Sequence, residues 1–277
     1  MKNYTQSPLP FQGQKRKFLS HVKQVLANSS DDATYVDLFG GSGILSHTVK
    51  QLKPSAKVIY NDYDNFSKRL SAVAQTNVLL DKIRLITKDL IKDKLITDSY
   101  KNRILEIVKQ EEFEVGYVDY ITLSSSLLFS AKYVTNYEEL SKQTFYNNVR
   151  QSNYVSDDYL QGVDIVHKDY RELFEQYKEL NNVVFLVDPP YLSTDTTTYG
   201  SDSYWKLKDY LNVLDVLIGT NYLYFTSNKS QIVELCQWME TRTLDDVNPF
   251  KNSTTVCINT TLNKTAKYTD MMLYKLD

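Results

Sequence analysis

An acid, two prolines and a tyrosine stand together where a buried strand is expected to end. These residues, Asp188, Pro189, Pro190 and Tyr191, follow the apolar run Phe185–Val187. Proline has no backbone N–H to donate, so strand pairing stops at this point. In an open α/β sheet, ligands bind at the carboxyl ends of the strands. A carboxylate and an aromatic ring at that edge could accept hydrogen bonds from a flat ligand and stack on it.

A glycine-rich turn follows another strand-like run. Asp37 opens the stretch D-L-F-G-G-S-G, in which Phe39, Gly41 and Gly43 lead into an expected helix. Glycines let a backbone approach a ligand closely, and the start of a helix offers unpaired N–H groups. The spacing differs from that of the dinucleotide fingerprint. A tight turn that holds no ligand is the alternative interpretation.

A further acid, Asp62, ends the next strand-like run, roughly 20 residues beyond the glycine turn. In α/β folds that bind nucleosides, an acid at this place accepts hydrogen bonds from the ribose hydroxyls. Asp64, two residues later, is the rival for this role. Taken with the glycine turn, the pattern favours a nucleoside ligand over a solvated acid at a strand end.

Strand, turn and helix alternate along most of the chain, which predicts an α/β fold with a mostly parallel, Rossmann-like sheet. Residues 100–162 lack this alternation, so we expect an inserted, mainly helical subdomain there. Residues 1–99 and 163–277 then form one discontinuous catalytic domain. The expected strands include Tyr35–Leu38 and Val58–Asn61, the expected helices include Lys17–Leu26, Ile44–Leu52 and Ser203–Ile218, and an antiparallel strand pair is expected at the carboxyl end.

The composition excludes several classes of protein. The net charge of −2 argues against a broad, non-specific polyanion binder. Cys236 and Cys257 imply no disulfide framework, and neither has metal-type spacing to the histidines, so we expect no metal. No apolar run approaches membrane-spanning length, and a cytoplasmic location is expected.

Together, these motifs resemble the S-adenosylmethionine-dependent amino-methyltransferases, most closely the Dam-like DNA N6-adenine methyltransferases. The stretch PFQGQKRKF is similar to the family's N-terminal cofactor motif, and the glycine turn and D-P-P-Y match two further motifs. The order of these motifs, with the insertion before D-P-P-Y, is the alpha arrangement. The resemblance covers most of the chain outside residues 100–162. The Arg/Asn/Gly/Pro-rich recognition hairpin of the family members that read GATC is absent from the insertion.

The resemblance implies S-adenosylmethionine as the cofactor and double-stranded DNA as the partner, and it leaves open whether a partner nuclease exists. The catalytic residues it implies are Asp188, Pro189, Pro190 and Tyr191. The residues it implies at the cofactor are Phe11, Lys15, Asp37, Phe39, Gly41, Gly43, Asp62, Asp169 and Asp188.

The chemistry explains these residue types. The exocyclic amine of adenine is a poor nucleophile, and two acceptors aimed at its N–H bonds would make it more reactive. We expect Asp188 and the Pro189 carbonyl to be these acceptors. Tyr191 suits stacking on a flipped base, with Tyr199, Tyr204 and Trp205 as weaker candidates. No cysteine nucleophile is required.

Contacts with DNA are expected from the insertion and from a basic stretch, Gln14–Lys17. The insertion offers Lys132, Lys142 and Arg150 for phosphates, and Asn147, Asn148 and Arg150 for base edges. Two other functions remain as alternatives: a methyltransferase acting on another planar amine, such as an RNA adenine or cytosine N4, and a catalytically silent DNA-binding relative.

Overall fold

The computed structural model describes residues 2–129, 132–191, 205–241, 248–261 and 267–276, which form two compact units. Unit 1 comprises Met1–Gln6, Gln14–Asp64 and Asp158–Asp277. Unit 2 comprises Ser7–Gly13 and Asn65–Asp157.

These bounds differ from the predicted insertion at residues 100–162, because helix packing divides the chain elsewhere. In unit 2, α4 (Val73–Thr87) packs against α5 (Asp98–Val115), so the helical unit already includes the residues after Asn65. At the other boundary, the Tyr159 hydroxyl donates to the Ser42 carbonyl at 2.8 Å. The chain has therefore returned to unit 1 before residue 162.

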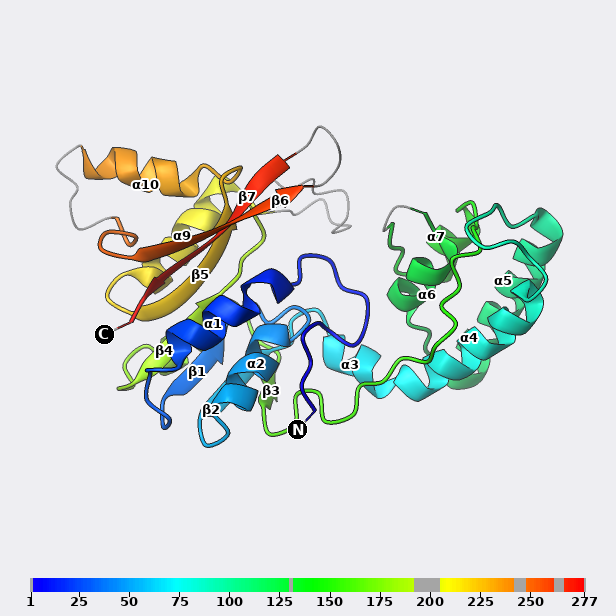
Figure 1. The fold of residues 1–277 in the computed structure, drawn as a ribbon, viewed down its shortest axis with the longest axis horizontal. Coiled ribbons are helices and arrows are strands. Elements are labelled where there is room, and N and C mark those ends of the chain that lie inside the picture. Colours follow the sequence, from blue (N-terminus) through cyan, green and yellow to red (C-terminus); the bar gives the residue numbers. More distant parts are fainter. Residues whose placement is uncertain (1, 130–131, 192–204, 242–247, 262–266, 277) are drawn as a thin grey trace. The chain divides into compact units, whose positions relative to one another are not determined.

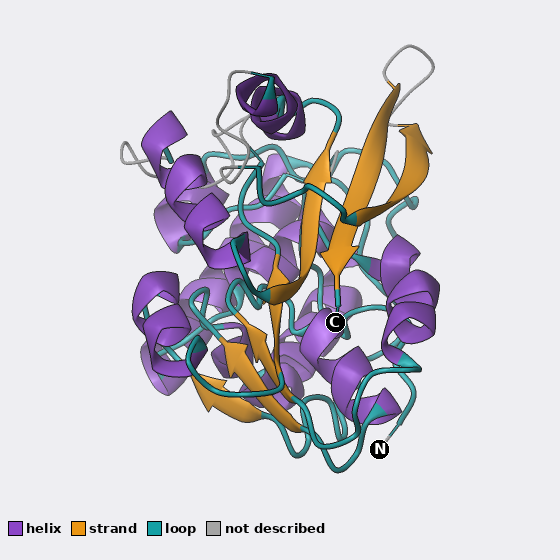
Figure 2. Cartoon of the chain, turned by 90° about the vertical axis from the view of Figure 1, so that its left-hand side faces the viewer, coloured by secondary structure: helices purple, strands orange, loops and turns teal. Residues whose placement is uncertain are grey.

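Unit 1 is built on a seven-stranded sheet with the order β3-β2-β1-β4-β5-β7-β6. The first five strands in this order pair in parallel, and β7 pairs antiparallel with both β5 and β6. The mostly parallel sheet and the terminal antiparallel pair predicted from the sequence are confirmed (Figure 2). The strands are β1 (Thr34–Asp37), β2 (Lys57–Asn61), β3 (Asp164–Val166), β4 (Val183–Val187), β5 (Asn221–Ser227), β6 (Thr254–Thr261) and β7 (Lys267–Lys275).

Helices cover both faces of this sheet, as the alternation of side chains along buried strands requires. One face packs Val36, Phe185 and Val187 against α8, α9 and α10 in the main apolar core. The other face carries η1, α1 and α2 (Figure 1). On this face, Phe18 lies edge-on to Phe225. The helices of unit 1 are η1 (Arg16–Phe18), α1 (Leu19–Leu26), α2 (Ile44–Leu52), α8 (Tyr170–Tyr177), α9 (Leu207–Leu217) and α10 (Ile232–Glu240).

The strand order places a topological switch point between β1 and β4. From β1 the chain builds the sheet outward through β2 and β3, whereas β4 leads to β5 on the other side. The crevice outside such a pair of strand ends is the ligand site of open α/β sheets. Asp37 is the last residue of β1 and pairs with Leu186, two residues before Asp188. Both acids therefore lie at the switch point and on the same face.

Unit 2 is helical in its described part and has its own core. Its helices are α3 (Phe66–Ser71), α4, α5, α6 (Tyr120–Leu127) and α7 (Tyr137–Ser141). The buried Arg69 guanidinium donates through Nε to both carboxylate oxygens of Asp119 at 3.1 Å. It also donates to the Pro10 carbonyl, which ties the segment Ser7–Gly13 to this unit. Breaking a buried pair of this kind strands a charge away from water.

The glycine turn after β1 depends on a close approach between backbone and side chain. A Cβ atom at Gly40 would lie 2.2 Å from two ring carbons of Tyr60 and 2.8 Å from the Asn61 carbonyl oxygen. The Tyr60 ring is fully buried, and its hydroxyl lies 2.7 Å from the Gly41 carbonyl. Neither side has room to move, so only glycine fits at position 40.

We predict that Gly40→Ala lowers the free energy of unfolding by about 3 kcal/mol or more, since the added methyl overpacks a closed contact. Gly219→Ala is the matched control, because Gly219 has φ +70° and no atom within 4 Å of an added Cβ. In Gly219→Ala, the free energy of unfolding should fall by only about 1–2 kcal/mol, the cost of placing a residue with a side chain in the left-handed conformation. Urea unfolding of both variants decides this, and equal losses would contradict the close-approach explanation.

Candidate active site

An ion pair lies at the centre of the switch point. The Lys15 ammonium is 2.7 Å from Oδ2 of Asp188, and the two side chains are only 11% and 17% exposed. Burial raises the pKa of Asp188, while the charge and hydrogen bond of Lys15 oppose this rise. Lys15 directly precedes η1 and Asp188 follows β4, so two segments far apart in sequence meet at this pair.

The ring of Tyr191 also contacts the Lys15 ammonium. The Lys15 Nζ lies 5.1 Å from the centre of the Tyr191 ring, close enough for a cation–π interaction. Pro189 is buried and Pro190 is half-buried, so the backbone between the acid and the ring is held in a restricted conformation. Three of the predicted residues, Lys15, Asp188 and Tyr191, are therefore brought together.

Asp37 is a second acid at the switch point and is fully buried. Its Oδ2 accepts a hydrogen bond of 2.6 Å from the Ser46 hydroxyl on α2. Burial raises the pKa of Asp37 to about 7, Ser46 opposes this, and the nearby Asp188 adds to the rise. Asp37 is thus held beneath α2, near enough to Asp188 for the two carboxyl groups to interact electrostatically. The contact between Ser46 and Asp37 could not be foreseen from a local sequence pattern.

Asp62 at the end of β2 is buried, whereas its rival Asp64 is exposed. The Tyr60 hydroxyl lies 3.0 Å from Oδ1 of Asp62 and also contacts the Gly41 carbonyl. One tyrosine therefore holds this acid next to the glycine turn. Of the two candidates, Asp62 is therefore the buried one, and the Tyr60 hydroxyl connects it to the glycine turn.

Asn61, which sequence reasoning missed, organises the carboxyl edge of three strands. Its side-chain amide donates to the carbonyls of Leu38 and Lys168, at 3.0 and 2.9 Å. Its side-chain oxygen accepts from the Lys168 backbone N–H at 2.9 Å. Both the amide and the oxygen of the Asn61 side chain are hydrogen-bonded. Through these bonds, Asn61 connects β2 to the segments that follow β1 and β3. A polar amide directly after the apolar run of β2 was the signal in the sequence.

The remaining predicted residues differ in their surroundings. Asp169 caps α8 and pairs with the Arg171 guanidinium at 2.9 Å, and this contact holds the pKa of the carboxyl below its usual value. Phe39 lies in an aromatic cluster with Tyr170 and Trp205, at centroid distances of 4.9 and 5.6 Å. Phe11 belongs to unit 2, where its ring meets Phe66 at 5.7 Å.

The residues predicted to read bases have internal partners. Within unit 2, the Asn147 amide donates to the Leu90 carbonyl at 2.9 Å, and the Asn148 amide donates to the Leu128 carbonyl at 3.1 Å. Arg150 is exposed, and its guanidinium lies 4.5 Å from the centre of the Tyr154 ring. Both asparagine side chains thus hold the unit together, which counts against a role for them at base edges.

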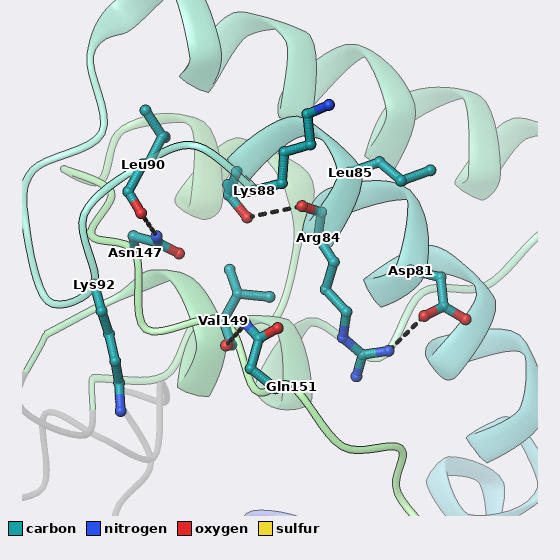
Figure 3. Close-up of a pocket in the computed structure, with 10 residues that line it drawn as sticks. Asp81, Arg84, Leu85, Lys88, Leu90, Lys92, Asn147, Val149 and Gln151 are labelled. Carbon is teal, nitrogen blue, oxygen red and sulfur yellow. Dashed lines mark hydrogen bonds and ion pairs between the residues drawn. The ribbon is translucent and has the colours of Figure 1, made fainter.

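Asn147 also lines an open cavity of about 730 Å³ in unit 2. Figure 3 shows Asn147 turned toward Leu90, while the Arg84 guanidinium points to Asp81. Arg84 further donates to the Arg150 and Ser152 carbonyls, so its charge is used within the unit. The polar side chains of Asn147 and Arg84 at this cavity are therefore engaged in contacts that stabilise unit 2.

The other basic candidates are surface residues. Lys132 is exposed, and Lys142 pairs with Glu138 at 2.6 Å on the surface of α7. Arg16 is exposed as well, and its guanidinium lies 3.4 Å from the Gln6 side-chain oxygen. Tyr199 and Tyr204, predicted as weaker stacking candidates, lie outside the described residues.

Comparison with known families shows what this chain is similar to. A family model of the D12 class N6 adenine-specific DNA methyltransferases matches residues 11–232. The chain belongs to this family. The resemblance to the Dam-like enzymes seen in the sequence is thereby confirmed.

Several proteins similar to this chain are described as methyltransferases or methylases. A Haemophilus influenzae protein described as a methyltransferase is 38% identical over 280 residues, covering 99% of this chain and 93% of the relative. Among solved structures, a SAM-dependent methyltransferase from Agrobacterium tumefaciens aligns with a TM-score of 0.42 at 9% identity over 95% of this chain. The alignment spans 63% of the length of that protein. An rRNA methylase from Streptococcus thermophilus aligns with a TM-score of 0.33 at 11% identity, covering 92% of this chain and 96% of the methylase.

S-adenosylmethionine is the cofactor of the methyltransferase family, and the residues at the switch point fit it. Gly41 and Gly43 have φ values of +51° and +71°, so the turn presents backbone without side chains at the start of α2. Asp62, the residue after β2, is the acid predicted from the sequence to bind a ribose. Beside it, the exposed Tyr63 ring stacks on His167 at 5.4 Å, a flat surface that sequence reasoning missed.

Two further properties of the methyltransferase concern only its described residues. No group of three or more histidine, cysteine or acidic side chains arranged to hold a metal ion occurs among them. In the same part of the chain, no helix is both long and apolar enough to span a membrane.

The raised pKa of Asp37 generates a prediction for stability. Between about pH 4 and 7, the folded chain keeps a proton on Asp37 that the unfolded chain has lost, so the free energy of unfolding falls as the pH rises. Asp37→Asn has no such proton, and we expect it to lose roughly 2–4 kcal/mol less over this window. Urea unfolding at pH 4.5 and 7.5 measures the difference. If wild type and variant lose equal stability, Asp37 titrates normally; Asp64→Asn controls for removal of an exposed carboxylate.

Proposed function

We propose that this methyltransferase is a site-specific DNA adenine N6-methyltransferase, which moves a methyl group from S-adenosylmethionine to the exocyclic amine of a flipped adenine. The observation that carries the proposal is the largely buried Lys15–Asp188 pair at the switch point, with two prolines and Tyr191 directly after Asp188. The first position of this motif is an acid, which favours adenine as the substrate. Enzymes that act on other planar amines more often have serine or asparagine at this position.

Asp188 is the acceptor for one N–H bond of the amine. Burial alone would favour its neutral form, which accepts hydrogen bonds poorly, and the Lys15 ammonium counters this effect. A carboxylate has two oxygens, so Oδ2 can keep the ammonium while Oδ1 accepts from the substrate. Lys15 therefore acts on Asp188 by keeping it ionised in a buried place.

The Pro189 carbonyl is the second acceptor. A proline fixes the backbone torsion φ, and two consecutive prolines restrict the direction of this carbonyl. Acceptors that are already oriented stabilise the positive charge that the amine nitrogen develops during transfer, without reorganising. Bound S-adenosylmethionine supplies the electrophilic methyl group on its sulfonium. The protein's part is to hold the amine in line with it, because proximity provides much of the rate.

Tyr191 is the platform for the flipped base. The amine of a paired adenine cannot be reached inside a duplex, so the base leaves the stack. Stacking on an aromatic ring recovers about 1–3 kcal/mol per base. The ring of Tyr191 follows Asp188 by three residues and is held next to the Lys15 ammonium. A base on this ring would present its edge to the two acceptors.

Recognition of the target sequence belongs to unit 2 in this proposal. Its helices interrupt the α/β chain before D-P-P-Y, where similar enzymes hold their recognition region. Since the Asn147 and Asn148 amides are bound to backbone carbonyls, other side chains must meet the base edges. Of the three residues first considered, only Arg150 is exposed.

We predict that Asp188→Asn lowers kcat for methyl transfer to duplex DNA at least about 100-fold, because an oriented acceptor of the transition state is lost. Affinity for S-adenosylmethionine, measured by calorimetry, should change little. Asp64→Asn is the control, since it removes an exposed acid near the same edge. The product is identified by mass spectrometry of nucleosides from methylated duplex DNA and from RNA. Full activity of Asp188→Asn would contradict the mechanism, and methylcytosine or methylated RNA would contradict the substrate.

A second prediction concerns the cofactor. Asp62→Ala should weaken S-adenosylmethionine binding by about 1.5–3 kcal/mol, because charge-assisted hydrogen bonds to the ribose are lost. Asp64→Ala should bind as wild type does. Calorimetry on both variants assigns the acid, and the opposite ranking would give the role to Asp64.

A further inference from the structure

The short segment around η1 makes three contacts with the same face of the sheet. Phe18 is buried and lies 5.6 Å from Phe225 of β5, which anchors the segment in the core. Lys15 pairs with Asp188 after β4. Lys17 reaches further along the sheet, and its ammonium donates to the Thr260 hydroxyl of β6 at 2.9 Å. The cofactor motif is thus tied to the C-terminal hairpin formed by β6 and β7.

The contact of Lys17 continues to a second carboxylate. The Thr260 hydroxyl donates to Oδ2 of Asp270 on β7 at 2.8 Å. Thr260 is 8% exposed, so this hydrogen bond lies largely away from water. The result is a chain of two hydrogen bonds, Lys17–Thr260–Asp270, that joins the first and last parts of unit 1.

The register of the sheet puts Asp270 on the same face as Asp188. Leu186 pairs with Leu223, and Asp188 comes two residues after Leu186. Asp270 pairs with Ser227, which comes four residues after Leu223. Because side chains two residues apart share a face, both acids point toward η1.

We propose that the C-terminal hairpin completes the active site, with Asp270 as a positioning residue whose carboxylate is fixed by the Lys17–Thr260 contact and acts on the Lys15–Asp188 pair. Asp270 touches no reacting atom in this account. It adds a negative charge to a group of two ammoniums and one carboxylate on the same face. The hairpin lies beyond residues 11–232, the part of the chain that the family model covers.

The effect of Asp270 on Asp188 has a definite sign. Burial is the main cause that raises the pKa of Asp188, and Lys15 lowers this pKa. The charge of Asp270 raises it as well, so Asp270 makes the Asp188 carboxylate more basic. A more basic carboxylate is a stronger acceptor for the amine while it stays ionised. Lys15 before η1, Asp37 on β1 and Tyr224 on β5 also interact electrostatically with Asp188. Tyr268 on β7 interacts electrostatically with both Lys15 and Asp270.

The experiment compares four variants with wild type. Asp270→Asn keeps the shape and removes the charge, Thr260→Val removes the hydroxyl, and Thr260→Ser restores it. Asp164→Asn, which removes an exposed acid from β3, is the control. The first readout is the pKa of the Asp188 carboxyl by ¹³C NMR titration of aspartate-labelled protein, assigned with Asp188→Asn and Asp37→Asn. The second is kcat over pH with duplex DNA.

For Asp270→Asn we expect the Asp188 pKa and the acid limb of kcat to move down, because a negative charge near Asp188 is removed, with kcat about three- to tenfold lower at neutral pH. Thr260→Val should lower kcat similarly, whereas Thr260→Ser and Asp164→Asn should match wild type. An unchanged Asp188 pKa and kcat in Asp270→Asn, or equal loss in both Thr260 variants, would overturn the proposal.

The kinetic half of this test rests on the proposed function, but the titration needs no substrate. If wild type does not methylate DNA, the proposed function fails while the NMR readout still decides whether Asp270 acts on Asp188. Urea unfolding of each variant at pH 7 separates a loss of folding from a loss of positioning.

Discussion

The ion pair between Lys15 and Asp188 is the contact on which the rest of unit 1 depends. It buries two opposite charges where the ends of two central strands diverge, a position at which an unpaired carboxylate would lose its charge. The parallel sheet brings the end of β4 to this place, and η1, anchored by Phe18, brings the lysine. Each charge makes the burial of the other tolerable, so neither segment could be altered alone.

Around this pair, the structure arranges further acids by giving each a different partner. Asp37 is held by Ser46 inside the protein, Asp62 by Tyr60 beside the glycine turn, and Asp270 by Thr260 on the hairpin. These three partners are neutral hydroxyl groups, whereas the partner of Asp188 is the Lys15 ammonium. This difference fits the proposal that Asp188 is the carboxylate that acts on the substrate, while the other acids support the site.

Local patterns in the sequence predicted most of unit 1, because strand, turn and helix there follow simple periodicities. The strand ends carrying Asp37, Asp62 and Asp188 were placed correctly, as was α2 over its whole length. The division between the units was not, since the packing of α4 on α5 is a tertiary contact that no local pattern shows. The Lys17–Thr260 contact joins residues 243 positions apart and was equally inaccessible. Asn147 and Asn148 had suitable chemistry for bases, but their use by backbone carbonyls appears only in the fold.

The central claim is that this site methylates adenine in DNA through Asp188. The most direct measurement is base-resolved methylation sequencing of DNA from cells that express either the wild-type protein or an inactive Asp188 variant, in a host without adenine methylation. The account predicts N6-methyladenine at one short recurring sequence with the wild type, and none above background with the variant. Absence of N6-methyladenine with folded wild type, or an unchanged pattern with the variant, would contradict it.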